Sequence, residues 1–314
     1  LTVSSFSMDM LEPHAMAVQA NAQWQHPDIG KINADVVGGG FLQAYTLDLK
    51  GDIDHPDVGK QSFSALGKGD FDFIDISALN LDSDSGSMTA TGELAWVPDV
   101  SIDLDVDAKS FNTTQFAPEW PAELTGKVKL KVAIQQDKLR GALDIGTLNG
   151  KVRGYPFSGS GQVSLLDDDF QFKNLQLVAS GNRVNVNGQA SEPFDLSWEV
   201  DAKNISKLAL GVDGSVTANG TLTGSVANPI LNGKLRANRL AFQGQRLESA
   251  QADIRTADGQ YFLDGKLQGL LVKGERFSSA TVVGRGDVDK HEVDLSVNHA
   301  QAKLKASLEG AWLG

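Results

Sequence analysis

The chain has 314 residues, no cysteine and a formal net charge of −12. The absence of cysteine excludes a disulfide framework, a thiolate zinc site and a cysteine nucleophile. Residues 1–120 carry 19 Asp and Glu against 5 Lys, whereas the remaining residues carry 21 acidic against 23 basic ones. A nucleic-acid partner is therefore not expected, because phosphate binding needs a net basic face.

No apolar run approaches the roughly 18–20 residues of a transmembrane helix. The chain begins without Met or a signal peptide, and we interpret it as a segment of a longer protein. No Pro- or Ser-rich linker divides it, although 1–120 is its more acidic part. We therefore predict one continuous repetitive segment over residues 1–314.

Along the chain, apolar and polar residues alternate with a period of two. Residues 102–108 alternate Ile, Leu, Val and Ala with Asp, and residues 127–134 alternate aliphatic residues with Lys. Because successive side chains of a strand point to opposite faces, each stretch predicts a strand with one apolar and one wet face. The same alternation returns in three later stretches: 195–202, 293–297 and 302–308. The best helical candidate is Asn204–Leu210, with one or two turns.

Turn signals separate the predicted strands every 8–12 residues, as at Asp82–Gly86, Leu148–Gly150 and Ala257–Gly259. This spacing predicts on the order of 20–25 strands joined as hairpins, since parallel units need longer crossovers. An open sheet with that many strands must curl on itself. We therefore predict an all-β fold built from a long, mostly antiparallel, curled sheet.

The sequence offers no catalytic or metal-binding motif. None of the five histidines (His14, His26, His55, His291 and His299) has the spacing of a metal site or neighbours a nucleophilic serine. Asp82–Gly86 resembles the start of a calcium loop, but its Gly comes one position early and the required Glu is missing. The cluster of Asp52, Asp54, His55 and Asp57 is at most a weak cation site. We expect no enzymatic activity, no metal and no cofactor.

Several motifs in a fixed order resemble a known family. They are the stretches 118–126, 148–157, 180–188, 194–198, 220–235 and 291–310. In this order they are similar to the central periplasmic region of the TamB branch of the AsmA-like family. The resemblance is strongest from about Glu93 to Gly310, and each motif alone is ordinary turn chemistry.

The resemblance implies a taco-like β-groove with an apolar interior. It also implies a periplasmic location in a protein anchored in the inner membrane of a Gram-negative bacterium, and phospholipid transport to the outer membrane. Assembly of outer-membrane proteins such as autotransporters is a further implied role. The implied partners are phospholipid acyl chains, the outer-membrane protein TamA through a region outside this segment, and client outer-membrane proteins.

Periodicity alone leaves open whether the apolar faces pack on one another in a closed core or line an open groove. With the resemblance, we predict an open groove that shields acyl chains. Its predicted lining residues are Ile102, Leu104, Val106, Val128, Leu130, Val132, Ile134, Val184, Val186, Leu196, Trp198, Val200, Leu222, Leu235, Ala237, Ala252, Ile254, Val282, Val293, Leu295, Val297, Leu304, Ala306 and Leu308. The alternative functions are a scaffold that binds client β-strands by edge pairing, and a structural spacer.

Overall fold

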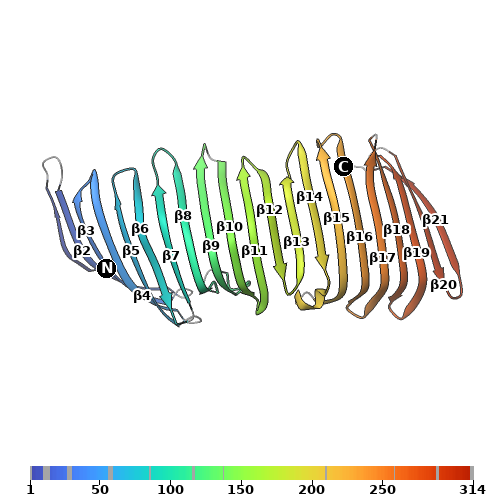
Figure 1. Ribbon diagram of the computed structural model, residues 1–314, viewed down its shortest axis with the longest axis horizontal. Coiled ribbons are helices and arrows are strands. Elements are labelled where there is room, and N and C mark those ends of the chain that lie inside the picture. The colour runs from blue at the N-terminus through green and yellow to red at the C-terminus, as the bar shows by residue number, and fades with distance from the viewer. Residues whose placement is uncertain are drawn as a thin grey trace. The chain divides into compact units, whose positions relative to one another are not determined.

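The computed structural model describes residues 2–9, 15–26, 30–55, 59–84, 86–114, 117–136, 138–208, 211–257, 259–287 and 290–311. These residues form 21 strands and one short 3₁₀ helix (Figure 1). The strand count falls within the range expected from the turn signals. The chain divides into two compact units, Leu1–Asp168 and Asp169–Gly314, which are described separately.

Unit 1 is a meander in which each strand pairs antiparallel with the next along the chain. Among the described residues β1 does not pair with β11, so this sheet is open. Its strands are β1 (Thr2–Met8), β2 (Ala15–His26), β3 (Gly30–Phe41), β4 (Ala44–His55), β5 (Gly59–Gly69), β6 (Phe73–Ser83), β7 (Gly86–Ala95), β8 (Val100–Asn112), β9 (Ala122–Gln135), β10 (Lys138–Val152) and β11 (Tyr155–Leu166).

Unit 2 repeats the same antiparallel meander. The 3₁₀ helix η1 (Ile205–Leu208) lies between its third and fourth strands, within the stretch for which the sequence suggested a short helix. Its strands are β12 (Asp169–Ala179), β13 (Asn182–Gln189), β14 (Phe194–Ala202), β15 (Val212–Gly224), β16 (Pro229–Phe242), β17 (Gln245–Ala257), β18 (Gln260–Val272), β19 (Glu275–Gly286), β20 (His291–His299) and β21 (Lys303–Gly310).

Two-residue turns ending in Gly join several of the hairpins. At Arg153-Gly154 and Lys273-Gly274 both central residues have positive φ, at 52° and 79° in the first turn and 50° and 88° in the second. This is the backbone of a type I′ turn, whose twist matches that of the two strands it joins. Glycine adopts positive φ without steric cost, so these short x-Gly turns fix the register of their hairpins.

Candidate functional site

In each unit the register places the aliphatic residues together on one face, which we call the apolar face. In unit 1, Ile102, Leu104 and Val106 of β8 lie opposite Val132, Leu130 and Val128 of β9. Ile134 lies opposite Val100 and Leu139 in the same phase. The residues that the period-two pattern selected in unit 1 therefore form one contiguous surface.

The same holds in unit 2, over ten strands. Val186 pairs with Trp198, and Leu196 pairs with Leu222. Farther along, Leu235 pairs with Ala252, which begins a continuous row across the later strands. The remaining predicted residues follow in register: Val184 with Val200, Ala237 with Ala250, Ile254 with Leu263, Val282 with Leu295, Leu295 with Ala306, Val293 with Leu308, and Val297 with Leu304.

Among the described residues, few apolar side chains are fully covered. Most of the buried ones are alanines, such as Ala90 and Ala237, and no large side chain has less than 2% of its surface exposed. The accessible surface is 19810 Å². Two separate compact domains of these sizes would together expose about 15,000 Å². The excess surface follows from apolar faces that no second layer covers.

On the apolar face, aromatic side chains lie against glycines of the neighbouring strand. A Cβ added at Gly220 would come within 2.3 Å of the Trp198 ring, and one at Gly51 within 2.6 Å of the Phe63 ring. The rings therefore occupy the space that side chains would fill on the next strand. This contact covers the backbone within a single layer, as aromatic residues do beside strand glycines.

The period-two pattern missed part of this face. Leu139, Leu143 and Ile145 of β10 lie in register with Ile134, Leu130 and Val128. Their alternation is broken by Gly141 and by a register shift after Ile145. The signal that could have found them is the short alternation of Leu143 and Ile145 around Asp144, which matches the alternation of β9.

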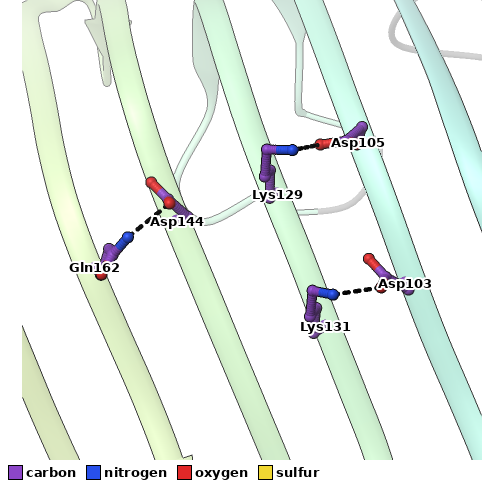
Figure 2. A network of polar contacts seen from close by, with 6 residues as sticks. All are labelled: Asp103, Asp105, Lys129, Lys131, Asp144 and Gln162. Carbon is purple, nitrogen blue, oxygen red and sulfur yellow. Dashed lines mark hydrogen bonds and ion pairs between the residues drawn. The ribbon is translucent and has the colours of Figure 1, made fainter.

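On the opposite face of unit 1, ion pairs connect β8 and β9, as Figure 2 shows. Lys131 Nζ lies 2.6 Å from Asp103 Oδ2, and Lys129 Nζ lies 2.8 Å from Asp105 Oδ1. A third pair joins Lys127 to Asp107 at 3.5 Å. The hydrogen bond from Lys129 to Asp105, together with nearby carboxylates, raises the pKa of Lys129 above its usual value of 10.5. We call these three pairs the charge ladder.

Across β12, β13 and β14, unit 2 uses amides in the corresponding role, whereas its later strands also carry ion pairs such as Arg285 with Glu292 at 3.1 Å. Gln176 Nε2 donates to Asn185 Oδ1 at 3.0 Å, and Asn185 Nδ2 donates to Glu199 Oε2 at 3.1 Å. These three residues share a row across β12, β13 and β14. We call them the amide ladder.

One set of strand ends in unit 1 is apolar. Exposed apolar side chains gather at the ends joined by the β9–β10 turn, at the upper edge of the view in Figure 1. The Trp96 Nε1–H donates to the Phe71 carbonyl at 2.6 Å, which fixes the Trp96 side chain at this edge. We call this edge the apolar rim; it comprises Phe41, Phe71, Trp96, Val97, Val100, Ile134 and Leu139.

The described residues contain no group of three His, Cys, Asp or Glu side chains that could hold a metal ion. Asp52 and Asp54 line a shallow hollow with Lys31 and Lys60, which offset their charge, and Asp57 lies outside the described residues. His299 is 3.4 Å from Glu275, and His14 is also outside the described part. No described helix has the length and apolar character needed to cross a membrane.

A family model described as "TamB, N-terminal domain" matches residues 14–313. The "Translocation and assembly module subunit TamB" of Haemophilus influenzae is 24% identical over 275 residues, which cover 86% of this chain and 20% of that protein. The chain thus spans about a fifth of the length of this curated relative. No solved structure matches. Since the family model covers nearly the whole chain, the chain belongs to the TamB family.

Proposed function

We propose that this chain is a conduit segment whose apolar faces shield acyl chains during phospholipid transport between inner and outer membranes. The observation that carries the proposal is an apolar face that runs through every strand pair of each unit and that no second layer covers. Burial of each CH₂ group stabilises a bound chain by about 0.8 kcal/mol. A lining of similar aliphatic residues favours no single stopping point, which suits movement along the face.

The proposal includes a location and partners. The printed name of the Haemophilus relative describes a subunit of a translocation and assembly module. We place this chain in the periplasm, as part of a protein anchored in the inner membrane. Its TamA contact would lie outside this segment, and its transport would support the assembly of outer-membrane proteins such as autotransporters. The proposed role is not enzymatic.

Native mass spectrometry with lipid extraction tests the proposal on the chain purified without detergent. We expect co-purified phospholipid that is lost, by at least about tenfold, in the double variant Leu130→Asn and Leu295→Asn, because each change removes apolar contact area from the face. The matched control is Leu66→Asn with Val283→Asn, which alters exposed apolar residues opposite Asp48 and Asp264 on the other face. A lipid-free wild type, or equal losses in both variants, would contradict the proposal.

A further inference from the structure

One set of strand ends in unit 2 is strongly basic. These ends lie on the side of η1, at the lower edge of the view in Figure 1. We define the basic rim as the turns on this side together with the three flanking residues of each strand. It carries three acidic residues, Asp201, Asp213 and Glu275, against eight basic ones. The eight are Arg183, Lys203, Lys207, Arg246, Lys273, Arg276, Lys303 and Lys305.

The other strand ends do not share this charge. The opposite ends of unit 2 have three basic residues (Arg255, Arg285 and Lys290) against six acidic ones among the described positions. Those six are Asp169, Glu192, Asp195, Asp287, Glu292 and Glu309. The basic excess is therefore a property of one edge and not of unit 2 as a whole.

Most of these cations are not neutralised within the protein. Lys203 pairs with Asp201 at 3.4 Å, and Arg276 pairs with Glu248 at 3.3 Å. The side chains of the other six make no ion pair or hydrogen bond with another described residue, and all six residues are exposed. Unpaired cations along one edge create a positive potential that attracts an anionic ligand.

The basic rim directly borders the apolar face. Leu304 is in register with Val297 of that face, and Lys303 and Lys305 flank it at the end of the strand. The two lysines leave the strand on the opposite face, and their long side chains reach a headgroup around the strand end. Phe242 is 46% exposed and begins the turn that leads to Arg246. Leu271 of β18 lies between two arginines, with Arg246 of β17 opposite it on one side and Arg276 of β19 opposite it on the other. An amphiphile can therefore place its chains on the apolar face and its headgroup at the cations.

We propose that the basic rim binds the headgroups of individual anionic phospholipids whose acyl chains lie on the apolar face of unit 2. This inference rests on the proposed function and adds a preference for net negative headgroups. Charge complementarity supports this inference. The phosphodiester of an anionic phospholipid has no cation within its own headgroup, and the basic rim offers Lys and Arg side chains without ionic partners. Headgroup preference would then be a property of unit 2, because unit 1 has no comparable basic edge.

The test offers the full chain equimolar vesicles of dioleoyl phosphatidylglycerol and dioleoyl phosphatidylcholine. The protein is then separated from the vesicles, and its bound lipid is extracted and quantified. We expect an enrichment of phosphatidylglycerol of about fivefold, which corresponds to about 1 kcal/mol. The enrichment should fall at 0.5 M NaCl, because salt screens exposed charges.

Two variants with the same change in net charge separate the rim from bulk electrostatics. The rim variant combines Arg246→Gln, Lys273→Gln, Lys303→Gln and Lys305→Gln. The control combines Lys31→Gln, Lys60→Gln, Lys109→Gln and Lys138→Gln, which are exposed lysines of unit 1. The rim variant should lose the enrichment and still bind phosphatidylcholine, while the control keeps the enrichment. Equal enrichment in the two variants overturns the inference.

Two further outcomes identify another source of the negative charge, and two concern lipid binding itself. Saturable binding of inorganic phosphate that the rim variant loses would make free phosphate the ligand and overturn a lipid headgroup. Protein that stays on phosphatidylglycerol vesicles without extracting lipid would make the rim a membrane-docking surface, which also overturns it. Equal retention of both lipids by the wild type overturns the headgroup preference alone, whereas retention of neither overturns the proposed function itself.

Discussion

Strands β8 and β9 of unit 1 and strands β12 to β14 of unit 2 present similar apolar faces but use different cross-strand pairs on their polar faces. Unit 1 uses the charge ladder of Lys127, Lys129 and Lys131 with three aspartates. Unit 2 uses amide hydrogen bonds centred on Asn185. The difference indicates that the apolar face is the feature both units need, whereas the polar face can be built from either kind of cross-strand pair.

The first prediction concerns the feature that the two units share. Trp198→Ala should raise amide hydrogen exchange in β14 and β15 by about 100-fold, because the ring covers Gly220 and a large apolar truncation costs about 3 kcal/mol. Phe63→Ala should produce a similar but smaller rise around Gly51 in unit 1. Mass-spectrometric exchange measures both. Little response to either change would mean that the aromatic contacts do not stabilise the sheets.

The second prediction separates the units by charge. Lys129→Asp should raise exchange in β8 and β9 by about tenfold, since it sets a new carboxylate opposite Asp105 and Asp144. Combining it with Asp105→Lys restores the opposite-charge pair and should recover most of the protection. Lys109→Asp is the control, because Lys109 makes no ion pair with a described residue. If the double variant exchanges as fast as the single one, the ladder does not stabilise the pairing.

The charge ladder also has a reason to exist at this place in the chain. The connection between β8 and β9 runs from Asn112 to Ala122 and is not a two-residue turn. A slip by two residues would keep every aliphatic side chain on the apolar face, so the hydrophobic pattern alone does not exclude it. Each such slip leaves one Asp and one Lys of the ladder without its partner. The ladder therefore helps to specify the register.

The third prediction addresses the amide ladder. Asn185→Ala should raise exchange in β12 to β14 by about threefold, because it removes two hydrogen bonds whose partners remain accessible to water. The effect should be the same at 0.05 M and 1 M NaCl, whereas the effect of Lys129→Asp should shrink at the higher salt concentration. If the effect of Asn185→Ala depended on salt, Glu199 would act through its charge. The amide ladder would then respond to salt as the charge ladder does, and the contrast between them would be lost.

The sequence predicted the fold class well because the alternation of β8 and β9 is regular. Leu104, Leu130 and Val132 flank charged residues at every second position, which a helix cannot accommodate on one face. The alternation in β10 is interrupted by Gly141 and a bulge, so the pattern did not assign Leu143 and Ile145. Their facing became clear only from the pairing with β9.

The basic rim could not be predicted, because its members are far apart in the sequence. Lys207, Arg246, Lys273 and Lys303 are isolated cations separated by roughly one hairpin each. Residues after 120 have nearly balanced charge, which hides the edge. The meander brings every second turn to the same side of the sheet and so collects these residues along one edge.

The alternation pattern also misleads when a control is chosen on the wet face of unit 1. From the alternation, Lys129 looks like an ordinary solvated lysine, and a change to Asp there should be mild. In the structure Lys129 is paired with Asp105 and lies opposite Asp144, so we expect that change to weaken the pairing of β8 with β9. A control substitution on the wet face must therefore be placed at a residue without a cross-strand ionic partner. The alternation of the strand does not identify such a residue.

The smallest predicted effect is the pH dependence of the charge ladder. The hydrogen bond and charge of Asp105 raise the pKa of Lys129 above 10.5, so the folded state binds this proton more tightly than the unfolded state does. The stabilisation is complete below pH 10.5 and is lost as pH rises through the folded-state pKa. Because Lys129 is exposed, we expect less than about a twofold change in exchange, relative to intrinsic rates, between pH 9 and 11. NMR titration of the Lys129 Cε resonance gives the direction directly. The comparison is Lys109, which has no ionic partner among the described residues. If the titration midpoint of Lys129 lay below that of Lys109, Asp105 would not stabilise the charged form of Lys129. The register of β8 and β9 would then depend on the apolar face alone.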